Sequence, residues 1–482
     1  MKKILKFFVF VLVLLIVIIS IKTVLFQSKQ TGVRSDRRKF QIDTNAVNHL
    51  RQAIQIKSIS YDNDSLTDYS QFNSLINFLE SSYPLTFEKL ESRVINKHSL
   101  LLHWKGSNKN NRPAIFYAHL DVVPANSSSQ WSHHPFAGHA DNEFIYGRGA
   151  IDDKGSIIAI LESTEKLLKN NFIPGRDIYF AFGHDEEASG QKGAKFISEE
   201  LEKEGIKAEF LLDEGGLIAV DMVPFVKPPV ALVFTSEKGY MTLQLSVKSN
   251  GGHSSHPPAM PPIEIMAAAI KNLHDHPFEK RMTQSVIDFM DYTGPEMKLP
   301  FKALFANRWL FKEIIFKEYE KIPSANAMIS TTAVATIIKG GEKENVIPSG
   351  VQAKINFRIL PGDNSSEIIQ KVKAVIHDDR VVITVVGKIE EASTVSSVES
   401  ESFALLHHSI EKIFPDAIIS PSLLIAQTDS RHFRNVTENI YRFIPFRMND
   451  KILDTMHGAD EKVGIAEFME AIAFYKEFIK EL

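Results

Sequence analysis

Short hydrophobic runs alternate along the chain with amphipathic stretches of helical spacing. Three of these runs, residues 113–118, 177–182 and 209–212, are predicted to be buried strands. Polar residues follow each run directly. His119 and Asp121 follow the first run, the acidic stretch 183-GHDEEASG-190 follows the second, and Asp213 follows the third. Strands alternating with helices are typical of an α/β sheet, in which the ligand crevice lies beyond the carboxyl ends of the strands. The three polar clusters therefore point to one site.

The hydrophobic pattern changes after about residue 237. It predicts strands over 241–249, 330–339, 350–359 and 381–386, and helices over 263–274 and 367–376. This order is that of a small α+β, ferredoxin-like βαββαβ domain inserted into the first, with an extra stretch over 277–325 inside it. From about residue 392 the chain is expected to return to the first sheet, with a strand over 439–446 and a terminal helix over 460–482.

The N-terminal segment has the composition of a membrane-insertion signal. Lys2, Lys3 and Lys6 precede fifteen uncharged residues that end at Ile21, and more apolar residues follow Lys22. The uninterrupted core is short for a span of roughly 20 residues, but the flanking lysines can extend it by snorkelling. No small-residue cleavage site follows, which favours an uncleaved anchor over a signal peptide. The body of the chain is then expected to be extracytoplasmic, and secreted if the segment is cleaved.

The composition excludes several classes of partner and of metal ligand. A net charge of −4 gives no basic footprint for a phosphate backbone, so nucleic acid is not expected as a partner. The chain has no cysteine, which excludes disulfides and thiolate ligands. Any metal must therefore be held by His, Asp and Glu side chains.

Each polar residue at the expected site also has an ordinary interpretation. His119 could be a core histidine whose tautomer Asp121 fixes by a hydrogen bond, since residues two apart on an extended segment share a side. Asp152 could be a helix cap, and Glu186 and Glu187 could belong to an acidic surface turn. None of these residues alone specifies a metal site.

Taken together, the polar residues form a hard-to-borderline ligand set suited to Zn²⁺. The set contains two imidazoles and three carboxylates, from His119, Asp152, Glu187, Asp213 and His457. Five protein ligands are one too many for a single tetrahedral site. They suit two metals that share a bridging carboxylate.

Several motifs resemble one known family. They are YAHLDVVP, YGRGAIDDKG, GHDEEASG, FLLDEGG, GGHSSHPP, NVIPSG, QTDSRHF and a late His-Gly. In their order and their residues they resemble the motifs of the aminoacylase and carboxypeptidase S superfamily of co-catalytic zinc hydrolases. Within that superfamily they are most similar to the branch of carboxypeptidase S and N-fatty-acyl-amino-acid synthase/hydrolase. The similarity runs from about residue 45 to the C-terminus, and only the N-terminal segment falls outside it.

The resemblance implies a role for each residue of the set. Asp152 would bridge two Zn²⁺ ions, for which Co²⁺ or Mn²⁺ could substitute, with His119 and Asp213 on one ion. The other ion would be held by Glu187 and His457. Glu186 would be the general base, Asp121 would orient His119, and the Asp152–Asp153 peptide bond would be cis. His184 is then left as part of the turn, and Asp185 is left without a role.

The resemblance also places residues of the inserted domain at the site. His253 would hydrogen-bond the developing oxyanion, while Asn345 and Arg358 would bind the substrate. A guanidinium binds a free carboxylate through two parallel hydrogen bonds, which suits Arg358. Because these residues lie outside the metal-binding sheet, we expect closure of the inserted domain, or a partner subunit, to complete the site.

The expected fold is therefore a mixed-sheet, phosphorylase/hydrolase-like zinc-peptidase domain with an inserted lid. The expected segments are an anchor or signal peptide over 1–27, a linker over 28–41, a catalytic domain over 42–236 and 392–482, and a lid or dimerisation domain over 237–391. The oligomeric state is left open. Aromatic residues of the stretch 277–325 could line an acyl pocket, although core packing explains most of them.

The expected activity is hydrolysis of the amide bond of N-acyl amino acids, including N-fatty-acyl amino acids, or of small peptides with a free carboxylate. A carboxypeptidase S-type peptidase is the nearest alternative. A synthase would use the same residues in reverse. A metal-free binding protein on this fold is the remote alternative, because every motif position is filled.

Overall fold

The computed structural model describes residues 1–32, 34–125 and 131–482. Residue 33, within the predicted linker, lies outside the described residues. The large sheet has the order β1-β2-β6-β3-β7-β17-β9-β8-β18, with β16 paired to β9. Its strands are β1 (Glu91–Ile95), β2 (Ser99–Trp104), β3 (Ala114–His119), β6 (Ile178–Gly183), β7 (Phe210–Asp213), β8 (Leu217–Ala219), β9 (Val230–Glu237), β16 (Ile418–Leu424), β17 (Ile440–Arg442) and β18 (Arg447–Met448).

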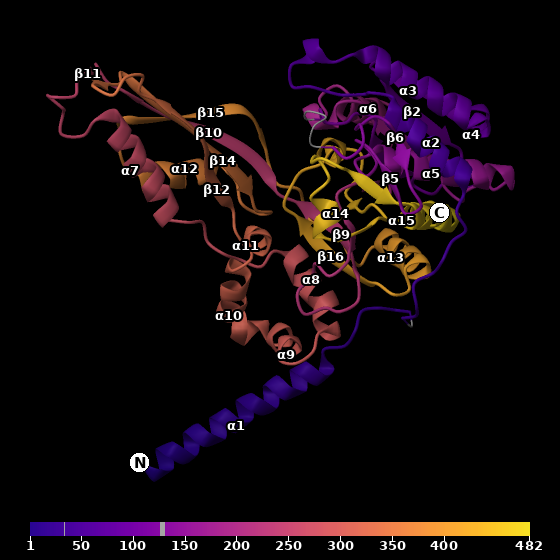
Figure 1. The fold of residues 1–482 in the computed structure, drawn as a ribbon. Helices are drawn as coiled ribbons and strands as arrows, with labels where there is room; N and C mark the ends of the chain where they lie inside the picture. The colour runs from indigo at the N-terminus through magenta and orange to yellow at the C-terminus, as the bar shows by residue number, and fades with distance from the viewer. Residues whose placement is uncertain (33, 126–130) are drawn as a thin grey trace.

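Helices cover both faces of the large sheet (Figure 1). In β3, Phe116 packs into one hydrophobic cluster and the next residue, Tyr117, packs into another on the opposite face. A strand buried on both faces is typical of a parallel sheet with helices above and below. The helices are α2 (Thr44–Gln55), α3 (Tyr69–Ser82), α4 (Pro84–Lys89), α5 (Lys154–Lys169), α6 (Ala194–Lys203), α13 (Glu401–Ile413), α14 (Asp450–Leu453) and α15 (Ile465–Glu481).

Short elements complete this part of the chain. A three-stranded sheet contains β4 (His139–Ala140), β5 (Phe144–Tyr146) and β19 (Lys462–Gly464). Single turns of 3₁₀-helix are η1 (Asp64–Leu66), η3 (Glu186–Ala188) and η5 (Asp429–Phe433). The predicted strand over 439–446 is shorter in the structure, where β17 has three residues, and the terminal helix begins at Ile465 instead of residue 460.

A second sheet extends away from the first (Figure 1). It has the order β12-β14-β10-β15, from β10 (Gly239–Lys248), β12 (Thr332–Gly340), β14 (Gly350–Ile359) and β15 (Val381–Glu390). Helices α7 (Pro262–Asp275) and α12 (Ser365–Ile376) pack on one face of it, and β11 (Gly252–His253) pairs with β13 (Val346–Ile347). The chain enters this sheet at Lys238, directly after β9, and leaves it through residues 391–396.

The predicted extra stretch folds into helices that pack on the large sheet and not on the second one. These are α8 (Gln284–Thr293), α9 (Phe301–Ala306), α10 (Arg308–Glu320) and α11 (Pro323–Ile329), with a turn η4 (Gly294–Glu296). Val286 and Phe305 share a hydrophobic cluster with Val230 of β9 and Ile418 of β16. Several aromatic residues of this stretch form that cluster, so core packing is their use. Phe278, at the start of the stretch, packs instead against the cluster of the second sheet.

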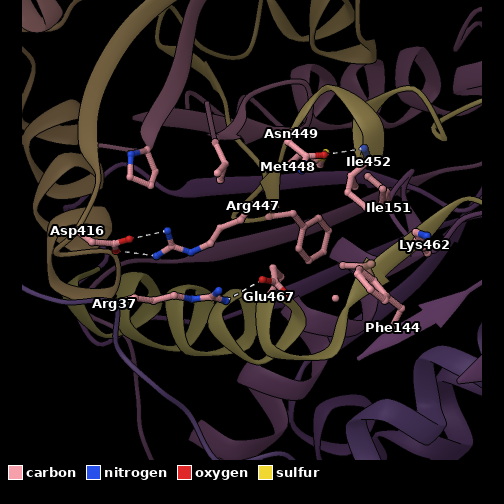
Figure 2. A pocket seen from close by; sticks show the side chains of 15 residues that line it. Arg37, Phe144, Ile151, Asp416, Arg447, Met448, Asn449, Ile452, Lys462 and Glu467 are labelled. Carbon is pink, nitrogen blue, oxygen red and sulfur yellow. Dashed lines mark hydrogen bonds and ion pairs between the residues drawn. The ribbon is translucent and has the colours of Figure 1, made fainter. Parts of the chain in front are cut away.

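The N-terminal helix α1 (Lys2–Leu25) is long and apolar enough to cross a membrane. The polar segment after it follows the surface of the body instead of hanging free. Its Arg37 donates to Glu467 and Glu470 of α15, and Arg447 binds Asp416 and Glu470 beside it. Arg37, Glu467, Asp416 and Arg447 line a cavity of about 410 Å³ (Figure 2).

Candidate metal centre

Most of the predicted metal ligands meet at the carboxyl ends of β6, β3 and β7, which are neighbouring parallel strands. His119 is the last residue of β3, and Glu187 lies in η3 after β6. Asp152 precedes α5, and His457 lies between α14 and β19. The Asp152–Asp153 peptide bond is cis, as expected. The edge of the sheet therefore gathers residues that are more than 300 positions apart in the chain.

The carboxylate of Asp152 lies between two imidazoles. Its Oδ1 is 2.7 Å from Nε2 of His119, and its Oδ2 is 3.0 Å from Nε2 of His457. Glu187 Oε1 lies 3.2 Å from the same nitrogen of His457. Each oxygen of Asp152 thus faces a different histidine, and the carboxylate is shared by two groups of side chains.

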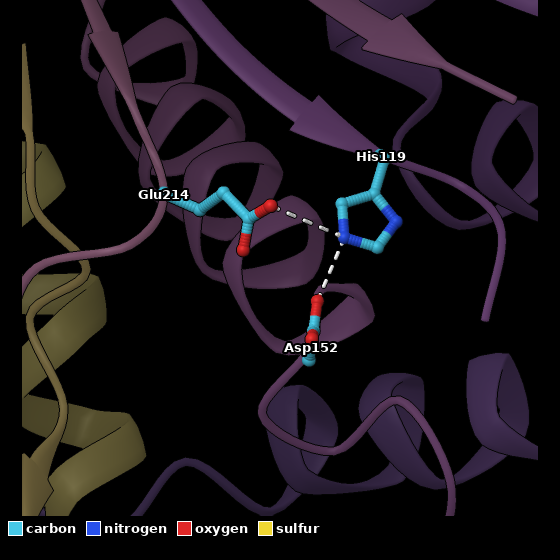
Figure 3. Close-up of side chains that lie close together, drawn as sticks. All are labelled: His119, Asp152 and Glu214. Atoms are coloured by element: carbon cyan, nitrogen blue, oxygen red, sulfur yellow. Dashed lines mark hydrogen bonds and ion pairs between the residues drawn. The ribbon is translucent and has the colours of Figure 1, made fainter. Parts of the chain in front are cut away.

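The carboxylate beside His119 belongs to Glu214, one residue after the predicted Asp213. Glu214 Oε1 lies 3.6 Å from His119 Nε2, and the ligand atoms of His119, Asp152 and Glu214 are all within 4.8 Å of one another (Figure 3). Asp213 instead accepts a hydrogen bond from the main-chain N–H of Ser430 at 3.1 Å. Adjacent residues at a strand end point to opposite sides. Glu214 is the one whose carboxylate lies beside His119, whereas Oδ1 of Asp213 is buried without a hydrogen-bond partner among the described residues.

Glu186 lies beside the cluster in a buried acidic environment. Its ligand atoms are within 4.8 Å of those of His119 and Glu187. Burial, followed by the nearby Asp429 carboxylate, raises the pKa of Glu186 well above its ordinary value. Asp429 in turn accepts a hydrogen bond from the hydroxyl of Tyr117 at 2.5 Å. The carboxyl group of Glu186 is therefore held next to the ligand cluster, in surroundings that favour its neutral form.

Asp121 fastens the end of β3 to the turn after β6. Its side chain lies 3.2 Å from Nδ1 of His119 and accepts hydrogen bonds from the main-chain N–H groups of Glu186 and Glu187 at 3.1 and 3.0 Å. Ser60 donates to its second oxygen. Burial opposes its charge, but these hydrogen bonds outweigh burial and hold the pKa of Asp121 below its usual range. Asp121, in its charged form, thus orients the ring of His119.

Glu461 holds the loop that carries Asp152, a function that we did not predict from the sequence. Its fully buried carboxylate accepts hydrogen bonds from the main-chain N–H groups of Gly149, Ile151 and Asp152, and Arg148 Nη1 lies 2.6 Å away. Glu461 lies within the motif DTMHGADE together with His457. The only sequence signal for Glu461 was its place four residues after His457, an expected ligand.

The carboxyl groups of the cluster carry an electrostatic cost. Burial raises the pKa of Glu187 and of Asp213, and it raises the pKa of Glu214 well above the ordinary value. Hydrogen bonds with Asp152 and Glu187 raise the pKa of His457 to about 10. Protonated imidazoles therefore offset part of the negative charge, and divalent cations would offset it more completely.

The three residues predicted on the second sheet are not gathered at the cluster. His253 is exposed in β11, at the end of this sheet away from the large one, and its Nδ1 contacts Ser255 Oγ at 2.7 Å (Figure 1). Asn345 lies beside it, since its carbonyl accepts from Ser254 N. Arg358 lies at the opposite end, near the join of the sheets, with its guanidinium 5.0 Å from the ring centre of Tyr240.

Comparison with known proteins gives consistent matches over most of the chain. Residues 115–481 match Peptidase family M20/M25/M40. A probable carboxypeptidase S-like 2 from Dictyostelium discoideum is 39% identical over 476 residues, which cover 97% of this chain and 92% of that protein. The N-fatty-acyl-amino acid synthase/hydrolase PM20D1 from Mus musculus is 36% identical, over 89% of this chain and 86% of that protein.

A solved structure has the same fold. The M20 family metallo-carboxypeptidase Sso-CP2 from Sulfolobus solfataricus superposes with a TM-score of 0.67 at 19% identity, over 90% of this chain and 98% of that one. The mixed α/β architecture is therefore that of the peptidase family.

Replacement of Glu461 is expected to destabilise the fold. In Glu461→Ala the buried Arg148 loses its counter-charge, which costs about 3–5 kcal/mol, and three main-chain donors lose their acceptor. Urea unfolding should show the loss, whereas Glu438→Gln, at an exposed position, should stay within about 0.5 kcal/mol of the unaltered chain. Equal stability of the two variants would contradict this role of Glu461.

His184 should make the fold sensitive to acid. Its ring is buried among Tyr69, Phe72 and His98, and burial lowers its pKa to about 4. The unfolded chain protonates this residue near pH 6.5, so between pH 4 and 6.5 the unfolded state binds more protons than the folded state. The contribution of neutral His184 is therefore complete above pH 6.5 and lost as the pH falls to 4, by about 3 kcal/mol at most.

The measurement is the free energy of unfolding against pH for the unaltered chain and for His184→Gln. The variant should show a flatter dependence between pH 6.5 and 4. Parallel curves would mean that His184 titrates normally in the folded protein.

Proposed function

The chain belongs to peptidase family M20/M25/M40 and is a hydrolytic enzyme, and we propose that it is a dizinc hydrolase that cleaves the amide bond of N-acyl amino acids or short peptides with a free carboxylate. One observation carries the proposal. The Asp152 carboxylate lies between His119 and His457, with Glu214 beside the first and Glu187 beside the second. This is the arrangement that two cations with a shared carboxylate require.

In this proposal Asp152 bridges two Zn²⁺ ions, or Co²⁺ or Mn²⁺ in their place. His119 and Glu214 hold one ion, and Glu187 and His457 hold the other. Glu214 takes the position that sequence reasoning gave to Asp213, because Glu214 and not Asp213 lies near His119. When bound, such ions lower the pKa of water and polarise a carbonyl group.

Glu186 serves as general base and then as general acid. Its carboxylate lies next to the ligand cluster, takes a proton from the attacking water and returns it to the leaving amine. Without cations, burial and the Asp429 carboxylate raise the pKa of Glu186 and favour its neutral form. Cations held beside it would favour the charged form, which can accept a proton. Asp121 acts indirectly, by holding the ring of His119 and the main chain of Glu186.

Arg358 binds the free carboxylate of the substrate. Its guanidinium is half-buried, and among the described residues no carboxylate forms an ion pair with it. Burial lowers the pKa of Arg358, but from a value so high that its charge remains at neutral pH. A planar, charged fork without a partner suits a ligand carboxylate.

His253 and Asn345 reach the substrate only after a movement or from another chain. Both lie at the far end of the second sheet, which joins the large sheet through Lys238 and residues 391–396. Closure about this join, or a partner subunit, would bring His253 to the oxyanion. The second sheet with α7 and α12, without helices α8 to α11, thus acts as the lid.

Similarity favours two substrate classes. A carboxypeptidase S-like relative and an N-fatty-acyl-amino acid synthase/hydrolase match almost the whole body of the chain. Both reactions involve an amide bond next to a free carboxylate, so the same residues serve either substrate and, in reverse, synthesis. The apolar α1 would anchor the enzyme in a membrane with its body outside the cytoplasm, or be removed as a signal sequence.

Replacement of the general base should abolish catalysis without loss of metal. We expect Glu186→Gln to lower kcat by about 10²–10⁴-fold on both an N-acyl amino acid and a dipeptide, while bound zinc per chain is unchanged. Glu199→Gln, on the surface of α6, is the matched control and should keep full activity. Near-normal turnover by Glu186→Gln would refute the assignment, and no turnover of any substrate by the unaltered chain would favour a binding protein.

The choice between Glu214 and Asp213 can be decided by counting metals. Because Glu214 lies beside His119, we expect Glu214→Gln to lose one zinc equivalent in elemental analysis, and Asp213→Asn to keep both. The opposite result would restore the assignment made from the sequence.

A further inference from the structure

The body of the protein holds the outer end of helix α1 and not only the chain that follows it. Asn307 Nδ2 lies 3.3 Å from the carbonyl of Ile19 and 3.2 Å from Thr23 Oγ1, both in the last two turns of α1. The ammonium of Lys22 lies 5.5 Å from the ring centre of Trp309. These contacts place the start of α10 at the depth where α1 would leave the lipid.

The segment after α1 fixes the orientation of the body. Gln30 exchanges two hydrogen bonds of 2.9 Å with the main chain of Ile419. Arg34 binds Glu296 at 3.2 Å, and Arg37 binds Glu467 and Glu470. Because these bonds begin five residues after Leu25, the end of α1, the body cannot turn a different side toward the membrane without breaking them.

The side that is held next to α1 exposes large apolar side chains. We call Phe225, Leu299, Trp309, Leu310 and Ile314 the apolar patch, and they are 61%, 71%, 54%, 39% and 47% exposed. Leu310 and Ile314 are one turn apart on α10, Leu299 precedes α9, and Phe225 stacks on Phe301 of α9. Figure 1 shows α9 and α10 beside the end of α1.

Basic side chains surround the apolar patch. Lys298, Lys302, Lys312 and Lys317 lie in the same stretch, and none of them takes part in an ion pair among the described residues. Of the nearby acids, Glu296, Glu318 and Glu320 are already paired with Arg34, Lys321 and Lys280, and Glu313 has no ion pair among the described residues. The uncompensated charge of this surface is therefore mainly positive, which suits anionic lipid headgroups.

We propose that the apolar patch docks into the outer surface of the lipid bilayer, beside the membrane-spanning α1. Exposed aromatic and aliphatic residues with flanking lysines are typical of helices that lie in the membrane interface. The proposal rests on the proposed anchoring by α1. Docking of the patch would fix the position of the enzyme on the membrane. An amphipathic N-acyl amino acid in the same interface would then be within reach of the enzyme.

The tryptophans of the chain offer a direct test. Trp104 and Trp131 are only 5% and 9% exposed, so Trp309 is the one that lipid can reach. The full chain is placed, one copy per disc, in nanodiscs of phosphatidylcholine and phosphatidylglycerol with or without bromine at carbons 6 and 7 of the acyl chains. Brominated lipid should remove the share of the fluorescence that Trp309 contributes, and it should leave the emission of Trp309→Phe unchanged.

A charged substitution separates docking from mere proximity. Ile314→Glu should reduce the quenching, whereas Val382→Glu, at a 55% exposed position on β15 of the second sheet, should not. Equal emission of the unaltered chain in both kinds of disc would overturn the proposal. Shielding of Trp309 from iodide only in discs that hold two copies would also overturn it, because a second chain would then cover the patch.

Hydrolysis of a soluble N-acetyl amino acid in the same discs separates this proposal from the proposed function. Turnover without quenching would refute docking and leave the hydrolase intact. Quenching without turnover of any substrate would support docking and count against the hydrolase. Release of the chain from discs by sodium carbonate would show that α1 does not span the bilayer and would overturn docking as stated.

Discussion

The repulsion among buried carboxylates at the ends of β3, β6 and β7 is the constraint on which the centre of this molecule depends. Asp152, Glu186, Glu187 and Glu214 lie around two imidazoles, in surroundings where burial disfavours the charged form of most of them. A fold gains nothing in stability from such a cluster. The arrangement suits a function in which positive charge enters the site, as in the proposed metal centre, and surrounding residues hold the cluster in place.

Two further buried carboxylates do most of that holding. Asp121 joins the end of β3 to the turn after β6, because it accepts from both main-chain N–H groups of that turn and contacts His119. Glu461 joins the loop of Asp152 to the segment of His457. Each binds main-chain donors from a different part of the chain, so the ligands are fixed relative to one another. The geometry of the centre therefore comes from its supports as much as from the parallel strands.

The sequence was sufficient to predict site residues that lie directly after a strand. Polar residues after three apolar runs predicted the edge of the sheet with His119 and Glu187 near it, and the motif resemblance added Asp152 and His457, whose side chains lie beside them. It does not decide between Asp213 and Glu214 as the ligand beside His119, because neighbours on an extended chain face opposite sides and the sequence does not say which side faces the site. The segment 28–41 was predicted only as a linker. Its contacts with the body could not be predicted, because its partners Glu411, Glu467 and Glu470 lie more than 370 positions away in the sequence.

The join between the two sheets also gives an order to substrate recognition in the proposed reaction. Arg358 pairs with Tyr240, the second residue of β10, and so lies next to the join, whereas His253 lies at the far end of a strand pair about 30 Å long. A rotation about the join moves a residue in proportion to its distance from it. In the proposed closure Arg358 would therefore move less than His253. Binding of the carboxylate can thus precede, and favour, the closure that completes the oxyanion site.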